Sequence, residues 1–308
     1  MTTPDSAVDR NIVAAGRGTR LGLRFAGLAY LSLLLLIPVL LVFYYAFEDG
    51  IASAFASVTT PEAQHAIWLT CVMVAIAVPV NTLFGVTCAL VLVRQKFRGK
   101  AFINALIDMP FAISPVVIGL SLVLVYGSVD GWFGVWLAEQ GIQVIFSPVG
   151  MVLATMFVSL PFVVREVVPV LQEIGEDQEQ AAKTLGANGW QTFWKITLPS
   201  IRWGVTYGVI LATARALGEF GAVAVVSGRI SGETETLPLY VRKLIDTFND
   251  SGAFMAALIL AALALMTLLA MNLVQRRDRN VGVAPSVIAE PAAIGASASA
   301  NQERTPGP

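Results

Sequence analysis

The chain has 308 residues, of which 56% are hydrophobic and 13% are charged, and its mean hydropathy is +0.72. A soluble globular protein carries about 25% charged residues, so this composition indicates an integral membrane protein. The formal net charge of −1 by itself says nothing about nucleic acid, but the sequence shows no basic face of the kind that a phosphate backbone needs. The single histidine argues against a metal cluster, and Cys71 and Cys88 are too far apart on one apolar segment to form a disulfide.

The N-terminal residues 1–22 are polar or small and rich in arginine, and an apolar run from Phe25 to Phe47 follows them. That run exceeds the roughly 20 residues that a helix needs to cross a bilayer. It is also longer than the hydrophobic region of a secretory signal. We therefore predict an uncleaved first transmembrane helix after a short tail.

Five further apolar runs approach or exceed the length of a bilayer crossing. They cover residues 66–93, 101–126, 149–171, 203–226 and 252–274. Backbone polar groups in lipid must be satisfied within each segment, and the sequence lacks the alternating strands of a barrel. The predicted fold class is thus an all-α membrane protein, with six transmembrane helices in a domain spanning residues 23–275.

The lysines and arginines are distributed unevenly over the predicted loops, and this bias sets the orientation. The loops 48–65 and 127–148 contain neither residue, whereas both termini and the loops 94–100 and 172–202 are rich in them. We therefore predict that both termini and the loop 172–202 are cytoplasmic. Beyond the last helix, residues 276–308 lack apolar periodicity and predict a disordered cytoplasmic tail.

The third predicted helix carries Asp108 and two prolines, Pro110 and Pro115, with Ser114 between them. Proline removes a helical hydrogen bond, so this segment is expected to bend. Within a membrane such a bend is tolerated only beside protein or a wet cavity. Either Asp108, Ser114 and Pro115 line a transport pathway, or the bend serves packing alone. Farther along, Arg165 and Glu166 in the fourth helix are interpreted as anchors at the membrane interface.

The polar segment 176–200 interrupts the apolar runs and has the pattern of a helix–turn–helix. Asp177 and Gln180 match a capping box at the start of a first short helix. Gly186 is placed to end that helix in a left-handed conformation, and Asn188 with Gly189 predicts a turn.

Within this segment Glu179 precedes Lys183 by four residues, the favourable order for an ion pair on a helix. After the turn, apolar residues recur at helical spacing and predict a second short helix that Pro199 closes. These residues are Trp190, Phe193 and Trp194.

The fifth predicted helix places Arg215 four residues before Glu219, so the two side chains share a face and can pair. Pairing lowers the cost of charge in apolar surroundings, and intramembrane charge often marks a transport pathway. Small residues around the pair permit close approach of another helix. The pair is either a gate that contacts a passing anion or a structural element.

The segment 176–200 resembles the signature loop of ABC importer permeases, Glu-Ala-Ala, three residues, Gly, nine residues, Ile-x-Leu-Pro. The matching residues are Ala181, Ala182, Gly186, Ile196, Leu198 and Pro199. The first position departs from the pattern, because it holds Gln180 and the acid Glu179 stands one residue earlier. The resemblance implies that this loop contacts an ATPase subunit, with a neutral hydrogen bond at Gln180 instead of a charged one.

Four other stretches, residues 108–120, 161–171, 215–222 and 226–234, are similar to sulfate/thiosulfate importer permeases of the W type. That resemblance implies a type I ABC importer permease in a bacterial inner membrane, paired with a T-type permease. It further implies two ATPase subunits below and a periplasmic sulfate-binding protein above. The sequence has no Gly-x-x-x-x-Gly-Lys-Ser/Thr loop, so we expect no enzyme activity and no bound cofactor, with ATP and Mg²⁺ used by the ATPase.

Three alternative functions also fit the sequence. Molybdate and tungstate permeases share the bent proline segment and a related Gly-Glu-Phe-Gly stretch. An ion-coupled secondary transporter would use intramembrane carboxylates, with Asp108 and Glu219 as candidates. A membrane scaffold would use the signature loop for assembly alone.

Overall fold

The computed structural model describes residues 17–279, and every regular element in that part of the chain is helical. The chain separates into two units, Met1–Leu268 and Leu269–Pro308. All contacts that position the candidate site lie in the first unit. The ends of the two predicted tails, residues 1–16 and 280–308, lie outside the described residues.

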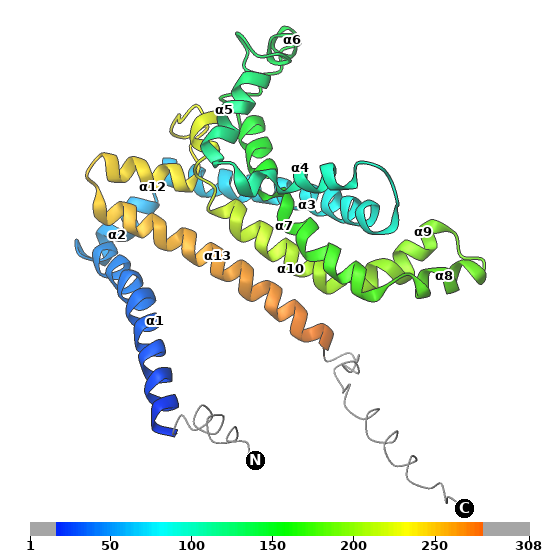
Figure 1. Cartoon of the computed structure of the whole chain (residues 1–308). Helices are drawn as coiled ribbons and strands as arrows, with labels where there is room; N and C mark the ends of the chain where they lie inside the picture. The colour runs from blue at the N-terminus through cyan, green and yellow to red at the C-terminus, as the bar shows by residue number, and fades with distance from the viewer. Residues whose placement is uncertain (1–16, 280–308) are drawn as a thin grey trace, which may run out of the picture. The chain divides into compact units, whose positions relative to one another are not determined.

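Four of the described helices are long and apolar enough to cross a membrane individually (Figure 1). They are α1 (Arg17–Ala46), α3 (Pro61–Arg94), α7 (Pro148–Ile174) and α13 (Asp250–Arg279). The bent pair α4 (Lys100–Ala112) and α5 (Pro115–Tyr126) makes a fifth candidate if it is one span. These findings confirm an all-helical, multi-pass membrane protein, while the number six stays a prediction.

The predicted fifth run, residues 203–226, is not one helix. It divides between α10 (Leu198–Leu217) and α11 (Val223–Val226), because the chain leaves helical geometry around Gly218 and Gly221. The remaining described elements are short. They are α2 (Ile51–Val58), α6 (Gly134–Glu139), α8 (Asp177–Thr184), α9 (Gly189–Thr192), the π-helical turn η1 (Phe193–Thr197) and α12 (Leu237–Asp246).

The helices α3, α7 and α10 pack on one another and form what we call the α3–α7–α10 bundle. Glycines let these helices approach closely: a Cβ added at Gly208 of α10 would lie 2.8 Å from Val163 Cα of α7. Across the α3–α7 contact, buried Asn81 donates to Ser159 Oγ and to Met156 O, both at 2.9 Å. Close packing and buried hydrogen bonds therefore make this bundle the base on which the polar loop 176–200 stands.

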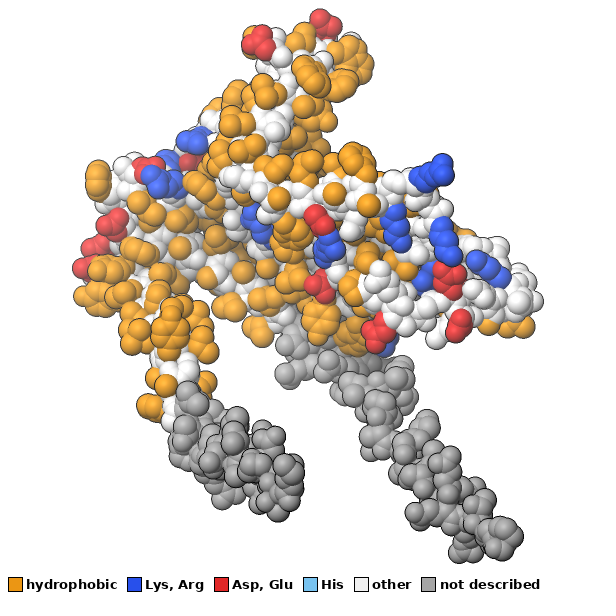
Figure 2. All heavy atoms as spheres, viewed as in Figure 1, with side chains coloured by type: hydrophobic (Ala, Val, Ile, Leu, Met, Phe, Trp, Pro, Cys, Tyr) orange, Lys and Arg blue, Asp and Glu red, His pale blue; other side chains and the backbone are white. Residues whose placement is uncertain are grey.

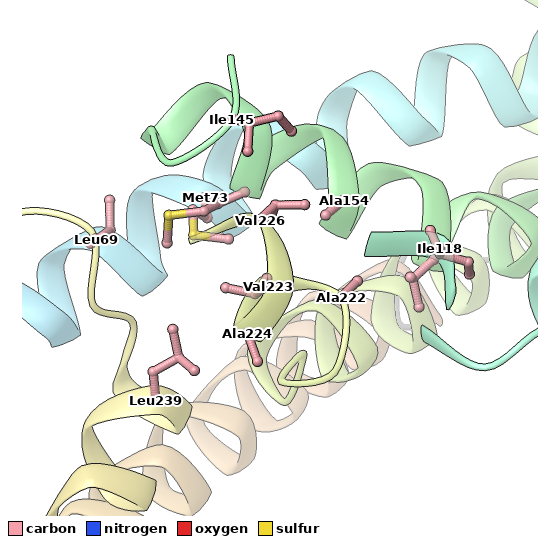
Figure 3. Packing of buried hydrophobic residues seen from close by; sticks show 12 residues of the cluster. Leu69, Met73, Ile118, Ile145, Ala154, Ala222, Val223, Ala224, Val226 and Leu239 are labelled. Atoms are coloured by element: carbon pink, nitrogen blue, oxygen red, sulfur yellow. The ribbon is translucent and has the colours of Figure 1, made fainter. Parts of the chain in front are cut away.

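A second apolar cluster holds α11 in place (Figure 3). Val223 and Val226 of this short element, and Ala222 directly before it, are buried together with side chains from α3, α5 and α7, among them Met73 and Ile118. This packing fixes the segment that follows Glu219.

Helix α1 contrasts with the bundle, because none of the residues in its most apolar stretch is buried by the rest of the chain. Hydrophobic side chains cover its surface and much of the surface elsewhere in Figure 2. A helix that is apolar on all sides fits a lipid or protein environment rather than water.

Candidate functional site

The first helix of the polar loop starts in a different way from the predicted capping box. Glu176 is the N-cap residue of α8 and makes no side-chain cap bond, while Asp177 is already the first helical residue. The predicted cap by Asp177 is therefore wrong, because the turn at Gly175, with φ of +70°, starts the helix one residue early. Asp177 and Glu179 still place negative charge in the first turn, where the helix dipole favours it.

The turn between the two short helices follows the prediction. Gly186 adopts φ of +85°, and the Ala187 amide donates to Ala182 O at 3.0 Å, as in a left-handed helix end. Asn188 then caps α9 through a capping box with Gln191, which sequence reasoning missed although the Asn-x-x-Gln spacing announces it.

The second short helix runs through η1 directly into α10. Pro199 thus does not close the unit as predicted; it lies in the first turn of α10, directly after the π-helical turn. Trp190 and Trp194 contact each other edge to face, with ring centroids 5.5 Å apart. The loop is consequently a continuous helical extension of the α3–α7–α10 bundle.

The loop presents an apolar surface made by Leu185, Trp190 and Trp194, whose exposed fractions are 88%, 72% and 50%. We call these three residues the exposed loop surface. Trp190 and Trp194 are in contact, and exposed apolar patches mark interaction sites. In Figure 2 lysine and arginine side chains gather at the end of the first unit where Figure 1 places α8 and α9.

The signature residues divide between this exposed side and the bundle side. Gln180, Ala181 and Gly186 are exposed, whereas Ala182 is buried. Ile196 and Leu198 are half-buried. Small exposed residues beside large apolar ones are suited to close contact with another protein.

Glu179 does not pair with Lys183 as predicted. Its carboxylate lies 3.0 Å from Nε of Arg94, the last residue of α3, and both side chains are about five-sixths buried, at 15% and 16% exposure. The acid of the signature loop therefore faces its own chain, and the neighbouring Gln180 takes the outward position.

The predicted bend of the proline segment is confirmed. The axes of α4 and α5 differ by 114°, with Ser114 at the break and Pro115 as the first residue of α5. The break lies against the segment after Glu219, since a Cβ at Gly221 would be 2.9 Å from Pro115 Cβ. A Cβ at Gly119 would likewise be 2.8 Å from Ala222 O.

Arg215 and Glu219 form the predicted ion pair, with Arg215 Nη1 2.7 Å from Glu219 Oε2. Glu219 lies just beyond the end of α10, its residue is 2% exposed, and its Oε1 accepts from the Ala222 amide at 2.9 Å. Arg215 keeps 31% of its side chain exposed. The carboxylate is thus held by the chain, while the guanidinium remains partly accessible.

Asp108 also has a partner, which the sequence did not announce. Arg165 of α7 binds it through two nitrogens, with Nε 2.6 Å from Oδ1 and Nη2 on Oδ2. One helical turn away, Phe111 and Phe162 meet edge to face with centroids 5.2 Å apart. Both charged side chains are partly exposed, at 35% and 44%. No hydrogen bond or ion pair between described residues links this pair to Arg215 and Glu219.

Comparison with known proteins places the chain in a family. Residues 81–280 match the family described as binding-protein-dependent transport system inner membrane component. The chain is 52% identical over 250 residues to the sulfate transport system permease protein CysW of Synechocystis sp., covering 81% of this chain and 90% of the relative. The corresponding CysT protein of Escherichia coli (strain K12) is 36% identical over 250 residues, covering 81% of this chain and 90% of the relative.

The fold has solved neighbours as well. A chain in the crystal structure of a bacterial alginate ABC transporter in complex with an alginate pentasaccharide-bound periplasmic protein superposes with a TM-score of 0.72. The match covers 87% of this chain and 97% of that one at 19% identity, so it concerns the fold alone. The family match and the similarity to CysW confirm the resemblance found in the sequence. The chain belongs to the family of binding-protein-dependent transport system inner membrane components.

Proposed function

We propose that this chain is the W-type permease subunit of an ATP-driven sulfate/thiosulfate importer in a bacterial inner membrane. The observation that carries the proposal is the signature loop, which folds as a helix–turn–helix and turns Leu185, Trp190 and Trp194 outward. The similarity to CysW supports sulfate as the substrate. A T-type permease, two ATPase subunits and a periplasmic sulfate-binding protein complete the assembly, and ATP and Mg²⁺ are used by the ATPase.

In this assembly the chain crosses the membrane six times with both termini in the cytoplasm. The bent pair α4 and α5 forms one crossing, and α10 continued by α11 forms another. The uneven distribution of lysine and arginine over the loops supports this orientation.

Closure of the ATPase dimer pushes on the exposed loop surface. Because the loop continues into α10, and α10 packs on α3 and α7, the push moves these helices together and alternates access to the pathway. Packed helices can transmit such a push because their interfaces switch between discrete arrangements rather than deforming continuously.

The pathway is lined by Asp108, Ser114, Pro115 and Arg215, and the buried Glu219 holds Arg215 beside it. Charged side chains in membrane spans face protein or water rather than lipid, which supports a polar route beside them. A guanidinium binds an oxyanion through two parallel hydrogen bonds, as Arg165 binds the carboxylate of Asp108. Sulfate, a tetrahedral oxyanion like phosphate, can offer two of its oxygens to a guanidinium in a similar way.

Radiolabelled sulfate uptake in cells lacking this chain tests the proposal, with molybdate uptake measured in parallel. We expect wild type to restore sulfate uptake and Gly186→Asp, which puts a charge on the loop, to fail. Gly186→Asn is the matched control, because asparagine tolerates the left-handed φ of +85° and carries no charge. If the chain restores molybdate uptake but not sulfate uptake, molybdate replaces sulfate as the proposed substrate. Sulfate uptake in cells that also lack the ATPase would overturn the ABC mechanism.

A further inference from the structure

Arg94 donates to four acceptor atoms, two at the end of α7 and two in α8. Its guanidinium donates to Leu171 O at 3.1 Å and to Gly175 O at 2.7 Å, both at the end of α7. It also donates to the two carboxylate oxygens of Glu179 in α8, at 3.0 and 3.2 Å. On the far side, Thr197 of η1 donates to Glu179 Oε1 at 2.9 Å. We call Arg94, Glu179 and Thr197 the Arg94 node.

The Arg94 node ties the polar loop to the α3–α7–α10 bundle. Helix α8 packs mainly on α9 and η1, which belong to the same loop, whereas Arg94 belongs to α3. A small hollow adjoins the node and is lined by Arg94, Glu179, Ile174 and Ile196. The two bonds from Arg94 to Glu179 therefore connect α8 directly to the end of α3.

The chemistry of the node suits the transmission of force. A guanidinium holds a carboxylate with two parallel bonds in one plane, which fixes orientation as well as distance. Both charged side chains are largely removed from water, at 16% and 15% exposure, so solvent screens the pair little. The backbone carbonyls at the end of α7 hold the guanidinium from the other side.

We propose that Arg94 is a positioning residue that couples the exposed loop surface to α3 and α7. It acts through Glu179, so that a push on α8 moves both helices together with α10. This role also accounts for the shifted acid of the signature loop, because Glu179 is committed to the chain's own bundle and Gln180 is left to face outward. The proposal rests on the proposed function as an ATP-driven importer.

The test compares Arg94→Gln with wild type in the full complex with its partner subunits. We expect the complex to assemble and its ATPase activity to persist, while the number of sulfate ions imported per ATP falls roughly fivefold or more. Arg94→Lys is expected to fail as well, since an ammonium cannot form the two parallel bonds. The exchange Arg94→Glu with Glu179→Arg is expected to recover part of the coupling.

Arg242→Gln serves as the matched control, because it removes an arginine from an exposed ion pair on α12. It should leave the coupling ratio unchanged. Wild-type coupling in Arg94→Gln would overturn the proposal. A proportional loss of assembly, ATPase activity and import would also overturn it, since that pattern describes a purely structural role.

A second readout does not depend on transport. Spin labels at Lys96→Cys and Thr184→Cys, in a chain whose Cys71 and Cys88 are replaced by serine, report the distance between α8 and the end of α3. We expect a narrow distance distribution in the otherwise wild-type node and a broad one with Arg94→Gln, and equal widths would refute the link. If the wild-type complex imports no sulfate, only the proposed function is refuted. The distance measurement still tests whether the Arg94 node connects α8 to α3.

Discussion

The two arginine–carboxylate pairs in the apolar part of the chain are built in opposite ways. Arg215 and Glu219 are neighbours in sequence, and the carboxylate is buried and bonded to the Ala222 amide. Asp108 and Arg165 belong to different helices, and both remain partly exposed. The carboxylate is therefore buried in the first pair, which we call the sealed pair, and partly exposed in the second, which we call the open pair.

Because the two pairs differ in burial, they are expected to differ in how much they contribute to folding stability and in how accessible they are. A buried carboxylate that loses its partner leaves an uncompensated polar group, so the sealed pair must stay intact for the chain to stay folded. An exposed pair contributes little to stability and can exchange partners. We thus expect changes at Glu219 to act mainly on folding, and changes at Asp108 to act mainly on transport.

The largest effect is expected from Glu219→Ala. The substitution removes the partner of Arg215 and the acceptor of the Ala222 amide, so we expect the free energy of unfolding to fall by about 3 kcal/mol. Thermal unfolding of the purified chain in detergent measures this loss. Glu219→Gln is the matched variant, since it keeps an acceptor for the amide and should lose less. Equal melting temperatures of Glu219→Ala and wild type would show that burial does not make this pair important for stability.

The next largest effect concerns the glycine that brings the broken helix against the sealed pair. Gly119→Val would push a Cβ to 2.8 Å from Ala222 O, and overpacking of this kind costs about 1–3 kcal/mol. The same thermal unfolding assay checks this value. Gly218→Ala is the control, because the nearest atom to an added Cβ there is 3.8 Å away. A smaller loss for Gly119→Val than for the control would contradict the close packing.

Asp108→Asn tests the open pair. We expect stability to change by less than about 1 kcal/mol, since solvent screens both side chains. Sulfate import is expected to fall by roughly tenfold, equivalent to about 1.4 kcal/mol, because Arg165 loses its charged partner and retains anions too tightly. Uptake by cells carrying the variant measures this change, with Asp108→Glu as the charge-preserving control. If Asp108→Asn lowers the melting temperature as much as Glu219→Ala and leaves import normal, the open pair would serve stability rather than transport.

The sequence predicted those features that local patterns determine. Gly186 ends a helix at positive φ, the two prolines bend the third run, and the spacing of four residues joins Arg215 to Glu219. In each case the physical cause lies within one or two helical turns. The conformational preference of one residue type, or the spacing of two residues, was therefore sufficient to predict each feature.

The features that sequence reasoning missed depend on distant segments. Arg94 and Asp108 find their partners 85 and 57 positions away in the chain, and no spacing rule reaches that far. Lys183 lost the predicted pairing with Glu179, because Arg94 offers a fork of donors in a largely buried place and Lys183 stays exposed. Tertiary packing overrode a local preference worth only a few tenths of a kcal/mol.

The smallest effect sharpens the comparison by holding sequence spacing constant. Arg242 and Asp246 on α12 are four residues apart, as Arg215 and Glu219 are, and their closest atoms lie 2.9 Å apart. Their side chains are 61% and 54% exposed, so water solvates either charge when the other is removed. Asp246→Ala should therefore cost only about 0.3–0.5 kcal/mol in the thermal unfolding assay, several times less than Glu219→Ala. A cost close to that of Glu219→Ala would mean that spacing rather than burial sets the strength of these pairs, and the sealed and open pairs would then lose their distinction.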